Sequence, residues 1–223
     1  MNISMFDILG PVMIGPSSSH TAGAQRIGKA MYMISGKEEI AKVDFYLHGS
    51  FSHTLSGHGT DRALVAGLMG MDASDARIRN SLQIAKERGI EVSFQPEDLG
   101  DVHPNTVKVI ATTKSGKTYS MIGSSVGGGE VEIVEINGTK AKSSGKFPTI
   151  IVTHIDRLGV ISKISSILAH YEVNIVTMSN SREKKGSTAT TMIETDHEIP
   201  LSVKEELEEL DYIHQVVLVE KFA

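Results

Sequence analysis

The chain contains no cysteine among its 223 residues. It therefore forms no disulfide, offers no thiol nucleophile and cannot itself hold a metal cluster through thiolates, and this composition fits a cytoplasmic protein. It also lacks any run of 18 apolar residues, so no membrane span is expected. No basic segment followed by an apolar core opens the chain, so we expect no secretory signal.

Basic clusters and common ligand-binding motifs are missing as well. The net charge is −5 and no stretch is rich in Lys and Arg, so we expect no nucleic-acid partner. No HxxxH or HExxH pair, P-loop or GxGxxG after a strand occurs, so neither a histidine zinc site nor a nucleotide-binding loop is predicted. Apolar residues make up 40% and charged residues 22%, as in soluble globular proteins of one large or two small domains.

One polar stretch divides the chain. Residues 137–146 are rich in Gly, Ser and Lys and have no apolar period, which predicts a turn followed by a linker. We therefore expect an N-terminal domain over 1–140, a linker over 141–147 and a C-terminal domain over 148–223.

Apolar spacing predicts a mixed α/β fold for the N-terminal domain. A short apolar segment over 4–9 opens the chain. Helices are expected from His20 to about Gly36, over 63–71 and over 75–88. Strands are expected over 43–47, 106–112, 118–123 and 130–136. The three glycines at 127–129 fit either a flexible hairpin or a loop that another group approaches closely.

The C-terminal domain has a more regular pattern. Strands are expected over 149–153, 173–178, 187–193 and 213–219. One helix is expected over 160–171, and a second one begins at a capping box formed by Ser202 and Glu205. The order βαββαβ predicts a ferredoxin-like module with both helices on one face of an antiparallel sheet. The open edges of such a sheet favour pairing with a second copy.

The stretch 15–23 (GPSSSHTAG) places hydroxyls and an imidazole just before a predicted helix. Ser17, Ser18 or Ser19 could each be the N-cap. A cap needs only one hydroxyl, so three serines with His20 and Thr21 exceed that requirement. Because helix N-termini bind carboxylates and phosphates, the stretch is either a Ser-rich turn or an anion-binding site.

Histidines recur in the N-terminal domain, at positions 20, 48, 53, 58 and 103. Four of them lie in loops of Gly, Ser and Thr, where proteins often place catalytic groups. Within 57–61 (GHGTD), His58 lies between two glycines. Asp61 could orient the imidazole or stabilise its charge, as a general base requires. Alternatively, Thr60 or Asp61 is simply the N-cap of the following helix.

Four motifs together carry a resemblance to a known family: 15–21 (GPSSSHT), 57–61 (GHGTD), 103–105 (HPN) and 125–129 (SVGGG). They resemble the β subunit of the iron–sulfur-dependent L-serine dehydratases, and the resemblance covers the whole chain. The C-terminal domain resembles an ACT domain, a small regulatory fold of amino-acid metabolism. In this family the α subunit carries the cysteines that hold a [4Fe–4S] cluster, so the resemblance implies an α partner.

The resemblance implies the conversion of L-serine to pyruvate and ammonia. Joined to it, the residues suggest His58 as the base and His20 as a positioning group or proton partner, although these two roles could be exchanged. Asp61 completes the expected catalytic set. The expected substrate-binding residues are Ser17, Ser18, Ser19, Thr21, His103 and Asn105.

An alternative is a purely regulatory, amino-acid-binding subunit. The N-terminal domain also resembles the extra allosteric domain of some phosphoglycerate dehydrogenases, which binds a ligand without catalysis. The two histidine-containing loops favour the enzyme, because an effector pocket needs no neutral imidazole base.

A second ligand site is implied in the ACT domain. The stretches 154–159 (HIDRLG) and 173–175 (VNI) resemble the serine-binding positions of the ACT domain in phosphoglycerate dehydrogenase. By that match His154, Asp156 and Asn174 would contact a regulatory ligand. The family has Asn at 156 and Pro at 158, and a carboxylate at 156 would repel an effector's carboxylate but attract its ammonium. Alternatively, the module only dimerises.

Overall fold

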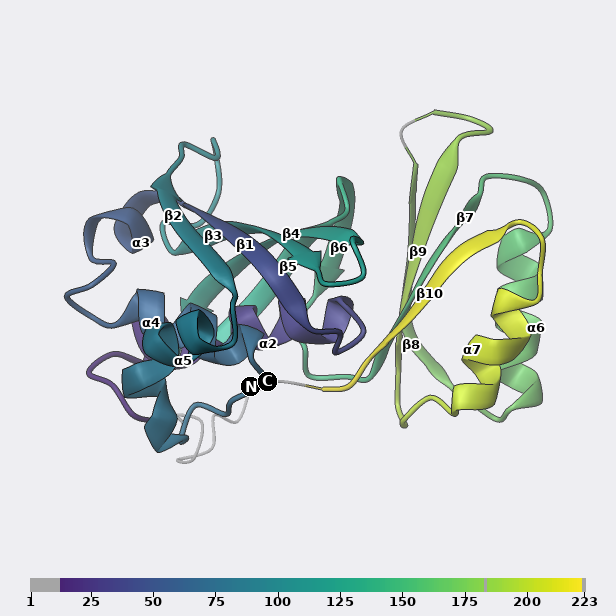
Figure 1. The fold of residues 1–223 in the computed structure, drawn as a ribbon. Coiled ribbons are helices and arrows are strands. Elements are labelled where there is room, and N and C mark those ends of the chain that lie inside the picture. The colour runs from purple at the N-terminus through teal and green to yellow at the C-terminus, as the bar shows by residue number, and fades with distance from the viewer. Residues whose placement is uncertain (1–12, 183, 222–223) are drawn as a thin grey trace, which may run out of the picture.

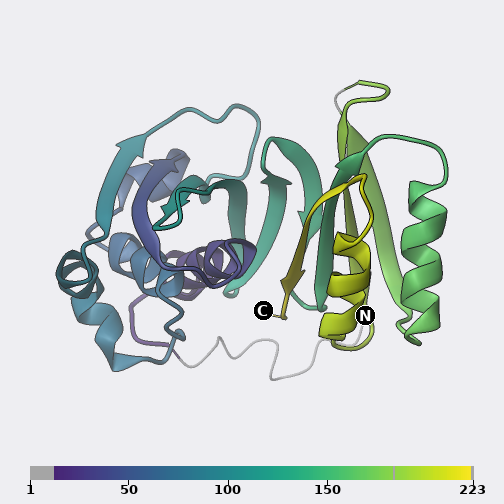
Figure 2. The ribbon, with the colours of Figure 1, turned by 45° about the vertical axis from the view of Figure 1, so that its right-hand side comes forward.

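A computed structural model describes residues 13–182 and 184–221. The apolar segment expected over 4–9 lies outside the described residues. Two units stand side by side, one built on a six-stranded sheet and one on a four-stranded sheet (Figures 1 and 2). No helix among the described residues is long and apolar enough to cross a membrane.

The first sheet has the strand order β2-β1-β3-β4-β5-β6. Only β1 and β2 pair in parallel; the other neighbours are antiparallel. The strands are β1 (Ile40–Leu47), β2 (Glu91–Pro96), β3 (Thr106–Thr113), β4 (Thr118–Gly127), β5 (Glu130–Ile136) and β6 (Thr139–Ser143). The sequence did not predict β2, a partly exposed edge strand, or β6, which forms within the stretch expected to be a turn and linker.

The expected helices of this unit are present but divided differently. The elements are η1 (Ser18–Gly23), α2 (Ala24–Ile34), α3 (Gly49–His53), α4 (Thr60–Leu68), η2 (Ala76–Asn80) and α5 (Ser81–Glu87). The prediction of a single helix over 75–88 is wrong, because the segment is divided into a 3-10 helix, η2, and the α-helix α5. Asp75 caps η2 by accepting from the N–H of Arg77, and the Ser81 hydroxyl donates to the carbonyl oxygen of Arg62, 2.7 Å away. Hence α5 begins where it is tied to α4.

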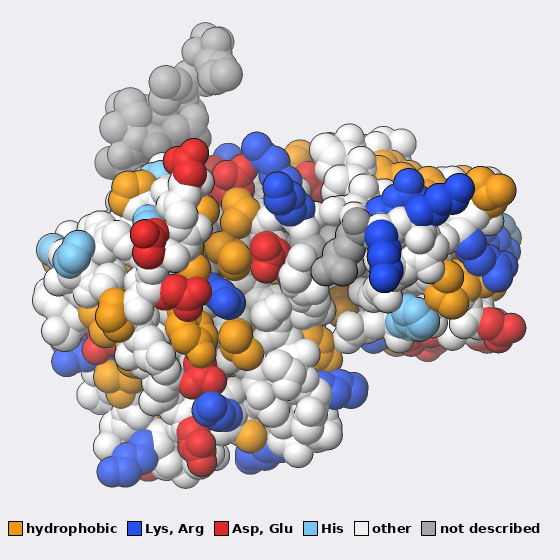
Figure 3. Space-filling model, turned by 90° about the horizontal axis from the view of Figure 1, so that it is seen from above, with side chains coloured by type: hydrophobic (Ala, Val, Ile, Leu, Met, Phe, Trp, Pro, Cys, Tyr) orange, Lys and Arg blue, Asp and Glu red, His pale blue; other side chains and the backbone are white. Residues whose placement is uncertain are grey.

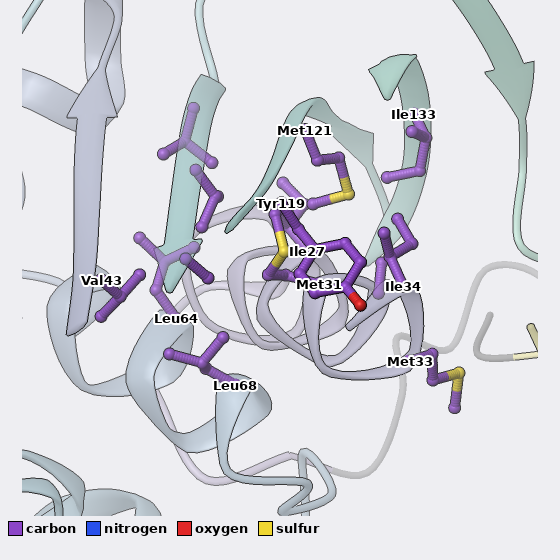
Figure 4. Packing of buried hydrophobic residues seen from close by; sticks show 14 of the residues in the cluster. Ile27, Met31, Met33, Ile34, Val43, Leu64, Leu68, Tyr119, Met121 and Ile133 are labelled. Atoms are coloured by element: carbon purple, nitrogen blue, oxygen red, sulfur yellow. The ribbon is translucent and has the colours of Figure 1, made fainter. Parts of the chain in front are cut away.

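Helices α2 and α4 pack closely on each other and against the sheet (Figure 1). Ile27 and Met31 of α2 lie beside Met121 and Ile133 of the sheet (Figure 4). The α2–α4 contact is so close that a Cβ on Gly28 would overlap the carbonyl oxygen of Leu64. The close contact joins the N-terminal half of α2 to the C-terminal half of α4.

The hairpin between β4 and β5 contains the three glycines. The backbone φ angles of Gly127, Gly128 and Gly129 are all positive, at 111°, 61° and 84°. Residues other than glycine rarely adopt such angles. Arg26 Nη1 donates to the carbonyl oxygen of Gly129, 2.6 Å away. The glycines therefore form a defined turn that α2 holds through Arg26.

The second unit has the predicted βαββαβ order. Its elements are β7 (Thr149–Ile155), α6 (Val160–His170), β8 (Ile175–Arg182), β9 (Thr188–Thr195), α7 (Leu201–Glu208) and β10 (Ile213–Val219). The antiparallel sheet has the order β10-β7-β9-β8, with α6 and α7 on its outer face (Figure 2). The capping-box prediction was wrong: α7 begins at Leu201 after Pro200, without a side-chain cap, so Ser202 is already the second residue of the helix and cannot be its N-cap.

The other face of the second sheet is covered by the first unit. Ile151, Met192, Val217 and Val219 belong to the same buried cluster as α2 and β4. An open cleft of about 780 Å³ follows β10 along this junction. On the face of the first unit seen in Figure 3, acidic, basic and hydrophobic side chains are interspersed. Strands β7, β9 and β10 are therefore covered on both faces, whereas the edge strand β8 is largely exposed.

Candidate active site

The serine-rich stretch forms the start of the helix that leads into α2. Ser17 is the N-cap of η1, and its Oγ accepts from the backbone N–H of His20 at 3.2 Å. Segment η1 is a turn of π-helix, a wider turn that is often found at functional sites. Ser18 and Ser19 are half-buried, and their hydroxyls have no hydrogen-bond partner among the described residues. Capping thus uses one of the three serines.

His20 is held on both ring nitrogens. Its Nε2 lies 3.0 Å from the Ser50 hydroxyl and its Nδ1 lies 3.4 Å from the Ser17 hydroxyl. The Phe51 ring packs edge-on against the imidazole, with centroids 5.4 Å apart. Burial, and secondarily the nearby His58, lower the pKa of His20 below its ordinary value. His20 is therefore a fixed and neutral imidazole at pH 7.

His58 lies beside His20, with ring centroids 5.2 Å apart. Its side chain is exposed, and its ring has no hydrogen-bond partner among the described residues. The Thr21 hydroxyl donates to the carbonyl oxygen of His58 at 3.4 Å, which ties the two loops together. Gly59, with a φ of 71°, lets the chain turn from His58 into α4. His58 is free to meet a ligand, whereas His20 is anchored.

The structure does not bring Asp61 to the His58 ring. The Asp61 carboxylate accepts from the backbone N–H of Arg62 at 2.8 Å. Gly59, rather than Thr60 or Asp61, is the N-cap of α4. Thr60 is buried, and its hydroxyl has no partner among the described residues. Asp61 therefore contributes a negative charge at the start of α4 rather than a hydrogen bond to the imidazole.

The loop containing His103 and Asn105 contacts Ser50, the hydrogen-bond partner of His20. The backbone N–H of Ser50 donates to the carbonyl oxygen of Pro104 at 2.8 Å, so this loop supports the serine that contacts His20. The His103 Nδ1 accepts from the backbone N–H of Asn105 at 3.1 Å, and its side chain is exposed. The loop therefore supports the site, and His103 contacts its own turn.

Two further oxygens in this region are buried without a partner. The Asn105 Oδ1 and the Ser125 Oγ have none among the described residues. The Ser125 hydroxyl occupies the space that a Cβ on Gly23 would need. The sequence analysis did not select Ser50 or Ser125 as site residues, although both lie in stretches that it examined. Nothing local distinguishes their hydroxyls from those of other loop serines.

A cavity of about 220 Å³ opens beside the two loops. Gly15, Thr21 and His58 line it, together with residues of α4 and η2. At about 30 Å³ per water molecule, it has room for a small amino acid rather than a nucleotide.

The residues of this chain do not fit an iron–sulfur cluster. Such clusters are held mainly by Cys thiolates, and the chain has no Cys. Among the described residues, no group of three or more His, Asp or Glu side chains could hold a metal ion. A cluster would therefore need ligands from another chain.

The three residues predicted to bind a regulatory ligand are not together. His154 is 2% exposed, and its ring nitrogens lie 2.9 Å from the carbonyl oxygen of Ile155 and 2.8 Å from the Thr191 hydroxyl. Asp156 pairs with Arg182, which with the N–H of Gly186 holds its pKa below the usual range.

Asn174 lies at the opposite end of the same sheet from His154 and Asp156. It precedes β8, whose start pairs with the end of β9, whereas His154 pairs with Ala189 at the start of β9. Its side-chain amide donates to Asp196. One chain alone therefore does not form the predicted ligand site.

Fold and site together define a class of protein: a two-unit α/β subunit in which a histidine- and hydroxyl-lined pocket is joined to an ACT domain. Residues 148–212 match the family model described as "ACT domain", and residues 4–135 match the one described as "Serine dehydratase beta chain". The chain belongs to the family of L-serine dehydratase beta chains.

Curated relatives agree with this assignment. The chain is 44% identical to the "Probable L-serine dehydratase, beta chain" of Bacillus subtilis (strain 168), over 96% of each chain. It is 42% identical to the "L-serine dehydratase, beta chain" of Peptoniphilus asaccharolyticus, over 90% of each. It is also 27% identical to the "D-3-phosphoglycerate dehydrogenase" of Methanocaldococcus jannaschii, over 76% of this chain and 32% of that protein.

Proposed function

We propose that this chain supplies the base and the substrate-binding side chains for the conversion of L-serine to pyruvate and ammonia, in a complex with an L-serine dehydratase α subunit. The observation that carries the proposal is the pairing of anchored His20 with exposed His58, 5.2 Å apart, beside a pocket of amino-acid size.

In this proposal His58 takes the Cα proton of L-serine on a ring nitrogen. A base must reach the substrate, and the His58 ring is exposed and unpartnered among the described residues. His20 is the proton partner and positioning group, because hydroxyls occupy both of its nitrogens. Its lowered pKa keeps it neutral and limits the charge that His58 meets when it becomes protonated. Loss of the Cα proton and of hydroxide leaves an enamine, which tautomerises and is hydrolysed by water to pyruvate and ammonia.

The hydroxyls of the serine-rich turn are the proposed neutral donors to the substrate. The hydroxyls of Ser18 and Ser19 in η1 have no partner in the described part of the chain, and Thr21 lines the cavity. Asn105 contributes an acceptor instead of a donor, its buried Oδ1, which has no partner among the described residues, whereas His103 supports the loop. Asp61 acts through its charge at the start of α4.

The [4Fe–4S] cluster implied by the resemblance is assigned to the α subunit. This chain has no Cys with which to ligate it. Its own contribution is to bind L-serine and to accept the Cα proton.

The test is reconstitution. The purified chain alone should be colourless and should not deaminate L-serine, whereas anaerobic mixing with the α subunit should give pyruvate at a rate proportional to complex. Deamination or a visible cluster in the single chain would contradict the proposal, as would an inactive complex with an intact cluster.

We also propose that the ACT domain self-associates and binds a small amino acid between two copies. Because Asp156 and Asn174 lie at opposite ends of one sheet, a ligand contacting both needs a second chain. Leu158, in the loop after β7, is 100% exposed and is a suitable contact for such a copy. His154 is buried and hydrogen-bonded to the Thr191 hydroxyl, so it would support the site without contacting the ligand.

A purely regulatory subunit is the second candidate. The observation in its favour is the similarity to a protein named D-3-phosphoglycerate dehydrogenase, whose name describes different chemistry. A regulatory chain would tolerate loss of the His58 imidazole in the α/β complex, so the His58→Ala variant separates the two candidates.

A further inference from the structure

Two arginines line the cavity beside His58, together with Gly15, Pro16 and Thr21 of the serine-rich stretch. Arg62 comes from the first turn of α4 and Arg79 from η2. Both side chains are exposed, and neither has an ion-pair or hydrogen-bond partner for its guanidinium among the described residues. Buried Ile78, which packs with Ala66 and Met71, forms an apolar part of the cavity wall.

The three nearby carboxylates that the structure describes each have another partner than the two guanidinium groups. Asp61 accepts from the backbone N–H of Arg62, and Asp72 pairs with Lys29. Asp75 pairs with Arg77 Nη2 at 2.6 Å and caps η2 as well, and these contacts lower its pKa to about 2. Among the described residues, no carboxylate therefore forms an ion pair with the guanidinium of Arg62 or Arg79.

Among the residues that the structure describes, no acidic residue lines the cavity, in a chain whose net charge is −5. By contrast, the larger cleft along β10 and the cavity beside His48 are each lined by carboxylates, including Glu38 and Asp98 respectively. A pocket with two unpaired guanidinium groups and no carboxylate attracts an anion. Guanidinium groups match the planar, two-oxygen geometry of a carboxylate.

The backbone keeps the two arginines together. The Ser81 hydroxyl donates to the carbonyl oxygen of Arg62, so α4 is tied to the chain that follows Arg79. The same cavity is lined by Thr21 and His58, so an anion held there lies next to the proposed base.

We propose that Arg62 and Arg79 bind the α-carboxylate of the amino-acid substrate in this cavity. The inference rests on the proposed function and names the groups that distinguish a free amino acid from an amine or an amide. Charge-assisted hydrogen bonds hold the carboxylate, and the substrate Cα is presented to His58. Thr21 and the serine hydroxyls are then neutral donors around the same substrate.

The first test uses the α/β complex with Arg62→Gln and Arg79→Gln. Each change should raise the KM for L-serine by about tenfold to a hundredfold, the usual effect of losing a hydrogen bond to a charged group, with a smaller effect on kcat. Arg77→Gln is the matched control, since Arg77 lies on the same segment but pairs with Asp75, and its KM should stay within about twofold of wild type. Unchanged KM values in both variants, or an equal rise in the control, would overturn the proposal.

The second test does not depend on activity. Side-chain Nε–Hε NMR signals of the full chain are followed during titration with L-serine and with L-serinamide, which lacks the carboxylate. Signals of Arg62 and Arg79 should shift saturably with L-serine and not with L-serinamide, while that of Arg77 stays in place. Identical responses to both compounds, or none, would refute the carboxylate site. If the wild-type complex is active but the arginine signals do not distinguish L-serine from L-serinamide, the carboxylate site is refuted and the proposed function is not. If Arg62 and Arg79 respond only to L-serine but the complex is inactive, the proposed function is refuted and the carboxylate site is not.

Discussion

Gly28 of α2 and Gly67 of α4 face each other across the contact between the two helices. A Cβ on Gly28 would overlap the carbonyl oxygen of Leu64, and a Cβ on Gly67 would overlap that of Gln25. Helix α2 continues the turn that holds His20, and α4 follows the turn that holds His58. The two glycines thus permit the close packing of the two helices that follow these histidines.

Gly28→Ala or Gly67→Ala should destabilise the protein by about 3 kcal/mol, because a backbone atom blocks the new methyl group and the helices must separate. Urea denaturation measures the loss. Gly57→Ala is the control: its φ is not positive and its Cβ would have ordinary room, so its stability should change by less than about 1 kcal/mol. Equal stabilities for the three variants would contradict the packing argument.

His58→Ala should reduce kcat of the α/β complex by about 10²–10⁴-fold, the usual contribution of a positioned base, with the fold intact. His53→Ala is the matched control, since His53 is an exposed histidine at the end of α3. Steady-state kinetics and far-UV circular dichroism check both variants. Activity of His58→Ala within a few-fold of wild type would exclude His58 as the base. His20→Ala should also impair turnover, with a larger share of the effect in KM.

Acidification should destabilise the protein partly through His20. Its pKa is lowered in the folded state, so the unfolded chain binds that proton more readily than the folded chain does. The free energy of unfolding should therefore fall as the pH drops below the ordinary histidine pKa of about 6.5. His20→Gln removes this group, so its stability should fall less than that of wild type between about pH 7.5 and about pH 5.5. Parallel pH profiles of the two proteins would refute this coupling.

Replacing Ser17, Ser18 and Ser19 together with alanine should raise the KM for L-serine sharply. The Ser17→Ala variant alone should mainly reduce stability, by about 1 kcal/mol, because only Ser17 caps η1. Comparing the triple variant with Ser17→Ala separates ligand binding from capping. An unchanged KM in the triple variant would show that the serines form only a turn.

Leu158→Asp should weaken self-association of the full chain without loss of stability, because the side chain is 100% exposed. Leu201→Asp, at a position 63% exposed at the start of α7, is the control. Sedimentation measures association, and calorimetry with L-serine and other amino acids measures ligand binding. The full chain is required, because Ile151 and Val217 of the second sheet pack against the first unit. A stable dimer that binds none of the amino acids would leave the ACT domain a structural role only.

Local sequence signals predicted much of the fold, and they selected His20, His58 and the serine-rich turn as candidate site residues. The period of apolar residues identified α2, α4, α6 and most strands, and the order of the last six elements predicted the ferredoxin-like module. The break between η2 and α5 was missed because it depends on the Ser81 hydroxyl reaching Arg62, a contact between two helices. The β6 strand was missed because polar residues with a turn before them form a strand there only through pairing with β5.

The sequence by itself determined which chemical groups this protein has: a cysteine-free chain, hydroxyls and an imidazole at a helix start, and a second histidine between glycines. These follow from composition and from residues close in the chain, so no fold is needed to find them. Only the tertiary structure decided that His20 is anchored by Ser50 while His58 stays free, and that Arg62 and Arg79 share a cavity with His58. Those relationships join residues far apart in sequence, and close helix packing sets them.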